Sequence, residues 1–328
     1  MSDIHITPLD FVMEAIVSAL RRASVRIQVA ISEDAASLTS AKPLGFDASG
    51  RPEQLQLQKN ASGDNVCALD VQADKIVEDE LRKVDVVAGY ASEEREHFVP
   101  FSVSGEYVVV CDPLDGSQNV PVGVSVGAIF GVFKASSLED IKSGDGIVGA
   151  GYALFSSCLQ FVWAESSVEM SMWKPSTQAW VTTAHQHKIP PKGKTYAINE
   201  GNANNWHMDV STFVQTHCRG KSVRWAACMV LDVHRELKQG GLFMYPCCKK
   251  YTKGRLRLVY EAYPIAFVWE KAGGVAWDKP NHRILDVPFP NHDVHQRAGV
   301  LLMGQWEKEK FAECVESVKG IVGEWGKY

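Results

Sequence analysis

The spacing of apolar residues predicts helices at both ends of the chain. Between residues 9 and 30, apolar side chains recur three to four positions apart, the period of one helix face. The pattern returns at 71–81 and at 306–325. In the second of these segments, one face holds Phe311, Cys314, Val315, Val318 and Val322. Residues 31–63 are polar and rich in Gly, Ser and Asn. We therefore expect two N-terminal helices separated by a long surface loop, and one C-terminal helix.

The middle of the chain predicts a sheet. Four runs rich in β-branched and aromatic residues occupy 107–111, 124–133, 147–154 and 159–164. Their composition and close spacing are typical of adjacent strands in one sheet.

The second half of the chain alternates strands with helices. Pro190 and Pro191, with glycines nearby, predict a boundary near residue 188. The elements expected beyond it are strands at 195–198 and 256–260 and helices at 226–237 and 265–272. Because strands and helices interleave, we predict an α/β or layered α+β class. The expected domains are residues 1–188 and 189–328.

Composition narrows the possible partners and location. The 328 residues carry a net charge of −5, and no basic stripe is present, which argues against a nucleic-acid partner. No stretch approaches the ~20 apolar residues of a membrane span. Eight cysteines without a C-x-x-C pair indicate reduced thiols. The first twenty residues have the pattern of neither a signal nor a transit peptide, so we expect a cytoplasmic protein.

Acidic residues are placed where predicted elements end. The run VVVCDPLDGSQN closes with Asp112 and Asp115, separated by Pro113, which cannot extend a strand ladder. We expect the chain to turn there and bring both carboxylates to one side. Gly116 then lets backbone amides approach a ligand closely. Further acids in the same kind of position are Asp64 and Asp70 in SGDNVCALD, Glu93 and Glu94 in YASEER, and Glu261 in RLRLVYE.

Carboxylate oxygens without His or Cys suit Mg²⁺, with Mn²⁺ as the alternative, better than Zn²⁺. Two or more such ions can clamp a phosphoryl group and activate water. Each motif taken alone also fits a solvent-exposed acidic face or a capped turn. It is the combination that points to a metal site.

The combination resembles the lithium-sensitive, Mg²⁺-dependent sugar phosphatases, and within them the fructose-1,6-bisphosphatase and sedoheptulose-1,7-bisphosphatase family. The resemblance runs from about residue 60 to the C-terminus. It is carried by GDNVCALD, ASEE, YVVVCDPLDGSQN, GAIFGVF, GYALFSS, INEG, MVLDVHREL, GGLFMYP, GRLRLVYEAYP, EKAGG and HQRA. It implies a five-layer α-β-α-β-α sandwich, a homodimer or homotetramer, and two to three metal ions in each site.

The resemblance also implies a role for each matching residue. The metal ligands would be Glu93, Glu94, Asp112, the Leu114 carbonyl, Asp115 and Glu261. Asp64 and Asp70, together with Glu94, would serve the attacking water. The substrate would be held by Asp115, Gly116, Ser117, Asn199, Met229, Tyr245 and Arg255, and by Arg224 reaching into the neighbouring subunit's pocket.

Three positions depart from what this family usually has in the sugar pocket. Asn202 and Trp225 stand where tyrosines are usual, and Arg255 stands where lysine is usual. The first two changes remove hydroxyl groups, and the third replaces a point charge by a planar fork. We therefore expect hydrolysis of the 1-phosphate of a longer sugar, sedoheptulose 1,7-bisphosphate. Fructose 1,6-bisphosphate is the alternative, and neutral drift around an unchanged pocket would explain the substitutions equally well.

Two further expectations concern regulation and activity. Glu106 stands before Tyr107 where AMP-inhibited relatives have lysine, and its charge would repel a phosphate, so we expect no AMP inhibition. A catalytically inactive sugar-phosphate sensor is a third possibility for the function. Such a sensor would have lost a metal ligand or a water-activating aspartate, and every such position is retained.

Overall fold

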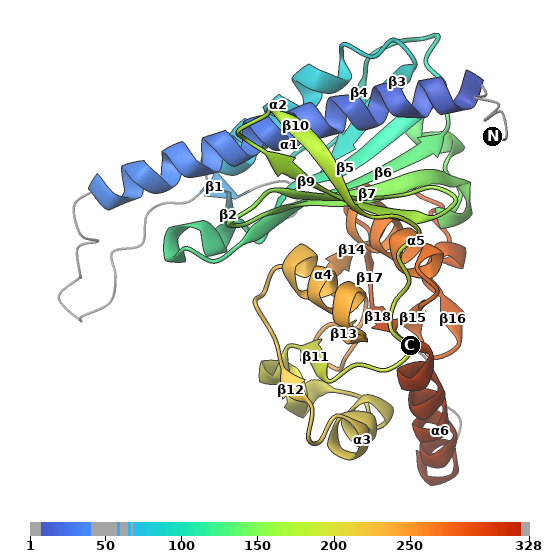
Figure 1. The fold of residues 1–328 in the computed structure, drawn as a ribbon. Helices are drawn as coiled ribbons and strands as arrows, with labels where there is room; N and C mark the ends of the chain where they lie inside the picture. Colours follow the sequence, from blue (N-terminus) through green and yellow to red (C-terminus); the bar gives the residue numbers. More distant parts are fainter. Residues whose placement is uncertain (1–7, 41–57, 60–64, 67, 323–328) are drawn as a thin grey trace, which may run out of the picture.

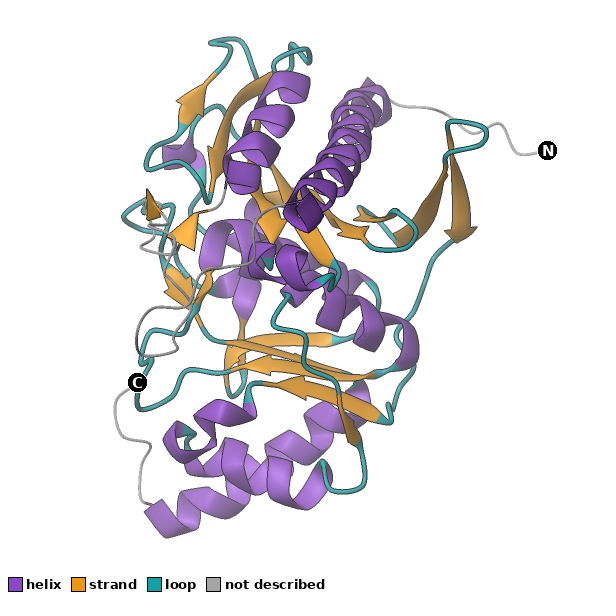
Figure 2. Ribbon diagram, turned by 90° about the vertical axis from the view of Figure 1, so that its left-hand side faces the viewer, coloured by secondary structure: helices purple, strands orange, loops and turns teal. Residues whose placement is uncertain are grey.

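The computed structural model describes residues 8–40, 58–59, 65–66 and 68–322. In this part of the chain, two main sheets alternate with three layers of helices, as Figures 1 and 2 show. The arrangement is helix–sheet–helix–sheet–helix, which confirms the predicted layered α/β class. No helix in the described ranges is both long enough and apolar enough to cross a membrane.

The first sheet has eight strands and is mostly antiparallel; only the β3–β5 pair is parallel. In spatial order its strands are β10 (Ala179–Ala184), β9 (Val168–Lys174), β8 (Gln160–Ala164), β7 (Ile147–Phe155), β6 (Val126–Lys134), β5 (Tyr107–Asp115), β3 (Val87–Ser92) and β4 (Val99–Pro100). The four strands predicted between 107 and 164 are therefore confirmed as neighbours.

The second sheet has six strands, in which β11 pairs in parallel with both of its neighbours. Its order is β12 (Ser222–Val223), β11 (Thr195–Ile198), β13 (Gly241–Tyr245), β18 (Val300–Met303), β15 (Val275–Lys279) and β16 (His282–Arg283). Two small ladders complete the set, β1 (Gln58–Lys59) with β2 (Asn65–Val66) and β14 (Leu256–Arg257) with β17 (Arg297–Ala298).

Each helix layer covers a particular sheet face. Helices α1 (Pro8–Ser40) and α2 (Ala68–Leu81) pack on the outer face of the first sheet. Helices α4 (Met229–Gln239) and α5 (Tyr263–Lys271) lie between the sheets and contact both. Helices α3 (Met208–His217) and α6 (Gln305–Val322) cover the far face of the second sheet.

The central layer packs closely because β6 presents a glycine to α4. A Cβ atom added at Gly127 would lie 2.3 Å from the Val230 Cβ, so a larger residue there would push α4 away from the sheet. This close approach sets the distance between the start of α4 and the end of β5, which forms part of the site described below.

Two expectations about where elements begin and end were wrong. The segment from 31 was expected to be a loop, but α1 continues to Ser40. No proline occurs after Pro8 until Pro43, and a helix already started on an apolar face extends through polar residues at little cost. The strand expected at 256–260 stops at Arg257, and residues Leu258–Ala262 form a π-helical turn that leads into α5.

A buried carboxylate on α4 gives a prediction about stability. Glu236 is fully buried; its Oε2 accepts a hydrogen bond of 2.8 Å from the Thr195 hydroxyl, and its Oε1 has no hydrogen-bond partner among the described residues. Burial raises the pKa of Glu236 from 4.5 to about 7, although the Thr195 hydrogen bond and the charge of Arg235 oppose the shift. The folded protein therefore binds this proton more tightly than the unfolded chain, and stability is lost as pH rises from 4.5 through 7.

Glu236→Gln removes that titration. We expect it to raise the free energy of unfolding relative to wild type by up to about 3 kcal/mol at pH 8 and to change it little at pH 5. Thermal unfolding of both proteins between pH 5 and 8 measures the difference, with the exposed Glu309→Gln on α6 as control. A wild-type–variant difference that does not change with pH would contradict the assignment.

Candidate functional site

A cavity of about 340 Å³ is lined by residues from both halves of the chain. Its size is within the range of small-molecule sites. Among the residues expected from the sequence, the cavity brings together Asp70, Glu93, Glu94, Asp112, Leu114, Asp115, Gly116, Ser117, Asn199, Trp225, Met229, Tyr245, Arg255 and Glu261. Residues nearly 200 positions apart therefore line one space.

The end of β5 supplies two of the carboxylates without the expected turn. The strand continues through Pro113 to Asp115, and its register with β6 shifts between Asp112 and Asp115. The Leu114 amide, which lies within this irregular stretch, donates a hydrogen bond of 3.0 Å to Asp112 Oδ1. A bulge re-aims side chains while the strand goes on, and here both aspartates line the cavity.

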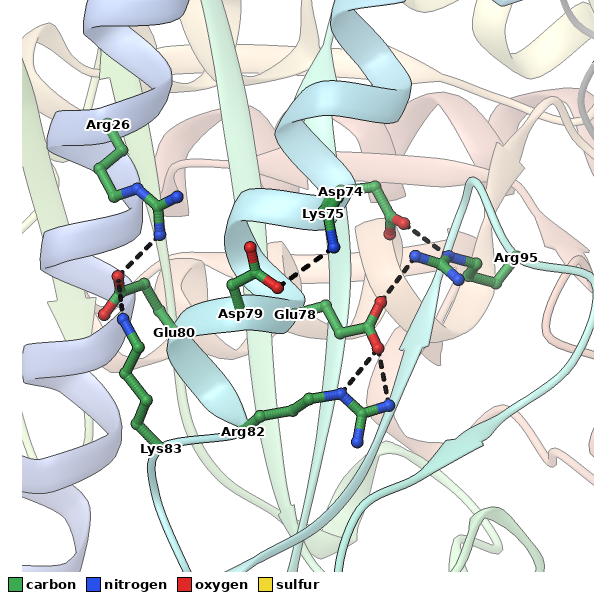
Figure 3. Close-up of polar contacts among 9 residues, drawn as sticks. All are labelled: Arg26, Asp74, Lys75, Glu78, Asp79, Glu80, Arg82, Lys83 and Arg95. Atoms are coloured by element: carbon green, nitrogen blue, oxygen red, sulfur yellow. Dashed lines mark hydrogen bonds and ion pairs between the residues drawn. The ribbon is translucent and has the colours of Figure 1, made fainter.

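The loop that carries Glu93 and Glu94 is tied to α2 (Figure 3). The next residue, Arg95, forms ion pairs of 2.5 Å with Asp74 and 2.8 Å with Glu78, both on α2. The Glu93 amide also donates to the Cys111 carbonyl of β5 at 3.1 Å. These contacts fix the loop against the strand that holds Asp112.

The π-helical turn places Glu261 in the same cavity. Its side chain reaches back four residues, where Oε2 accepts a hydrogen bond from the Arg257 amide. Such wide turns are common at functional sites because they rotate one side chain out of the helical series. The strand predicted here would have aimed Glu261 differently.

The N-terminus of α4 contacts the Asp115 carboxylate. The Val230 amide donates to Asp115 Oδ2 at 2.6 Å, and the Cys228 thiol lies 3.1 Å from the same oxygen. The amides at a helix N-terminus favour negative charge. Burial raises the pKa of Asp115, and these hydrogen bonds oppose the rise.

The carboxylates are close enough to influence one another. Burial raises the pKa of Asp112 well above its ordinary value, and the negative charges of Glu93, Asp115 and Glu261 raise it further. Within the described ranges, no three Asp, Glu, His or Cys side chains converge tightly enough to form a complete ligand set. The donors are nevertheless all oxygen and their charges repel, so a hard divalent cation such as Mg²⁺ fits their chemistry and charge.

The aromatic part of the lining comes from the second half of the chain. The Trp225 ring stacks on Phe243 with centroids 6.1 Å apart and lies 5.6 Å from Tyr245. Arg255 adds a positive charge and sits over the Tyr251 ring at 5.1 Å. A phosphate-bearing sugar requires both an apolar surface and a cation of this kind.

Among the described residues, two expected ones are not part of this lining, and a third expected residue is not described. Asp64 lies outside the described residues. Asn202 lines an adjoining space of only about 10 Å³, shared with Asn199 and Tyr245. Arg224 is exposed, and its guanidinium donates to the neighbouring Val223 carbonyl at 2.8 Å. Its role in a neighbouring subunit stays a prediction.

Sequence reasoning missed several lining residues, above all Asn119 and Cys228. The Asn119 side chain donates to the Ala226 carbonyl at 2.9 Å, and both oxygens of Asp232 accept from the Ala226 amide at 3.1 and 2.9 Å. Ala226, the residue after Trp225, is therefore held through both its amide and its carbonyl group. No local signal marks these contacts, because the partners of Asn119 and Cys228 lie more than 100 residues away.

Comparisons with known proteins place this geometry in a family. The model of the fructose-1,6-bisphosphatase N-terminal domain matches residues 55–185, and that of the C-terminal domain matches residues 189–316. Fructose-1,6-bisphosphatase of Saccharomyces cerevisiae is 36% identical over 272 residues, which is 78% of each chain. The cytosolic fructose-1,6-bisphosphatase of Spinacia oleracea is 38% identical over 261 residues, 75% of each chain.

A solved structure agrees over nearly the whole length. The crystal structure of Leishmania major fructose-1,6-bisphosphatase in holo form superimposes with a TM-score of 0.81 at 27% identity. The match covers 95% of this chain and 99% of that one. The comparisons identify a sugar bisphosphatase, a phosphoric monoester hydrolase, and do not support the expected preference for the seven-carbon sugar. The chain belongs to the fructose-1,6-bisphosphatase family.

Proposed function

We propose that this protein is a Mg²⁺-dependent fructose-1,6-bisphosphatase, which releases the 1-phosphate to leave fructose 6-phosphate. The observation that carries the proposal is one cavity lined on one part by a cluster of carboxylates and on another by aromatic rings and a cation, Arg255. One side suits metal ions and the reacting phosphate. The other suits the sugar and its distal phosphate.

The carboxylate side would hold two to three Mg²⁺ ions, with Mn²⁺ as an alternative. The proposed ligands are Glu93, Glu94, Asp112, the Leu114 carbonyl, Asp115 and Glu261. When bound, such ions neutralise phosphoryl charge and lower the pKa of water. Gly116 and Ser117 would hold the 1-phosphate through backbone amides and the hydroxyl, and Asp70, with Asp64, would orient the attacking water and accept its proton.

The choice of the hexose reverses the expectation drawn from three substitutions. Asn202 does not line the main cavity, so the change at that position does not enlarge it. Arg255 keeps a cation in place. Trp225 fills space with a larger ring packed on Phe243 and Tyr245. The relatives at 36–38% identity are named fructose-1,6-bisphosphatases. These points support the six-carbon substrate.

Steady-state hydrolysis of the two bisphosphates tests the proposal. We expect kcat/KM for fructose 1,6-bisphosphate to exceed that for sedoheptulose 1,7-bisphosphate by about tenfold, since one extra carbon in a fitted pocket costs that much. Phosphate release with Mg²⁺ is the readout. A preference for the seven-carbon sugar would overturn the choice of substrate, and release from neither sugar would favour a sensor.

Assembly, location and regulation belong to the same proposal. We propose a homodimer or homotetramer, because exposed Arg224 could then act in a neighbouring site. We propose a cytoplasmic location, consistent with the cytosolic relative from Spinacia oleracea. Glu106 lies 3.7 Å from Lys134, and both side chains are exposed. The carboxylate would partly cancel that cation for an anionic effector, which supports the absence of AMP inhibition.

A further inference from the structure

Cys228 is a buried thiol that lies between the two halves of the site. Its side chain is 1% exposed, and its Sγ is 3.1 Å from Asp115 Oδ2 and 3.5 Å from the Asp115 carbonyl oxygen. The residue also precedes α4 as its N-cap, where Sγ accepts a hydrogen bond from the Leu231 amide at 3.5 Å. One sulfur atom therefore contacts both a carboxylate of β5 and the first turn of α4.

The surroundings leave this side chain little freedom. A Cβ atom added at Gly116 would lie 2.7 Å from the Cys228 Cβ. The preceding residue, Ala227, has φ 56°, a left-handed backbone conformation that few residues other than glycine adopt. The backbone at Gly116 and the backbone conformation at Ala227 therefore both restrict the position of the thiol.

We infer that Cys228 is a positioning residue that fixes the orientation of the Asp115 carboxylate for cation binding. The thiol and the Val230 amide both contact Asp115 Oδ2, at 3.1 and 2.6 Å. The thiol approaches from a side chain, and the Val230 and Met229 amides approach from the backbone of the same helix end, so together they define the rotation of the carboxylate. This role rests on the proposed function, in which Asp115 is a metal ligand.

The position also links cation binding to the sugar side. Met229, the residue after Cys228, lines the cavity and begins α4. A shift of the α4 N-terminus would therefore move the carboxylate and the sugar wall together. Partners that orient a ligating carboxylate are typically worth 10- to 100-fold in metal affinity or activity.

Mn²⁺ titration monitored by electron paramagnetic resonance tests the role without substrate. We expect Cys228→Ala, which removes the donor, to weaken Mn²⁺ binding by about tenfold. Cys228→Ser keeps an O–H donor and is expected to stay within about threefold of wild type. Cys218→Ala removes an equally buried thiol, 1% exposed, whose side chain packs in the core beyond the second sheet, and should leave binding unchanged.

A second readout separates positioning from loss of fold. The Mg²⁺ concentration for half-maximal phosphate release from fructose 1,6-bisphosphate should rise for Cys228→Ala and return toward wild type for Cys228→Ser. Three outcomes would each overturn the inference. They are equal Mn²⁺ affinity in wild type and Cys228→Ala, equal weakening in both Cys228 variants, and no Mn²⁺ binding to the wild type. Failure to hydrolyse the sugar with the Mn²⁺ difference intact would overturn only the proposed substrate.

Discussion

Asp115→Ala should lower kcat for phosphate release from fructose 1,6-bisphosphate by about a thousandfold, the upper range for removing one electrostatic contact in a site. The carboxylate lies where β5 ends and α4 begins, and it accepts a hydrogen bond of 2.6 Å from the Val230 amide. Its loss takes a negative charge from the proposed metal side and leaves the start of α4 without that acceptor. Phosphate release at saturating Mg²⁺ is the measurement.

Asp115→Asn separates the two effects. The amide oxygen can still accept from Val230, so we expect a folded protein with the melting temperature of wild type. It cannot supply negative charge, so activity should fall nearly as far as in the alanine variant. Asp79→Ala, which removes an exposed carboxylate paired with Lys75 at 3.4 Å, is the matched control and should keep full activity. Activity of Asp115→Asn within tenfold of wild type would contradict the ligand assignment.

Lys221→Met should destabilise the protein by about 3–5 kcal/mol, because it leaves a buried carboxylate without its cation. The Lys221 ammonium lies 2.6 Å from Glu307 Oε1, and these side chains are 8% and 0% exposed. The same carboxylate oxygen accepts a hydrogen bond of 3.2 Å from the Gly193 amide. Glu307 therefore joins helix α6 both to Lys221, just before β12, and to the segment that links the two sheets. Thermal unfolding should show a drop of about 6 °C or more.

An exposed ion pair on the same helix supplies the control. Lys310 lies 2.6 Å from Glu313, and the side chains are 30% and 59% exposed. Lys310→Met should cost less than about 1 kcal/mol, since water screens such a pair. Adding Glu307→Gln to Lys221→Met should restore part of the lost stability, because no unpaired charge is then buried. Equal melting temperatures for the two single lysine variants would refute the importance of burial.

The sequence anticipated much of the site because its signals are local. The carboxylates of DPLD, SEE and the run ending in Glu261 could be recognised as hard-oxygen donors from residue type alone. The departure at Arg255 was equally visible and lies in the cavity. Asn202 lines a small adjoining space and not this cavity, which the sequence could not indicate, because whether a residue lines a cavity depends on packing that its sequence neighbours do not specify.

The sequence by itself determined the layered α/β class, the family and the chemical identity of the carboxylates, since periodicity and residue type are properties of short segments. Tertiary structure decided how those carboxylates meet. It kept Asp112 and Asp115 within one bulged strand, turned Glu261 inward on a π-helical turn, and brought Cys228 to Asp115 across 113 residues. For Cys228 the physical reason is the close packing of α4 on β6 at Gly127, a contact between distant segments that no local pattern encodes.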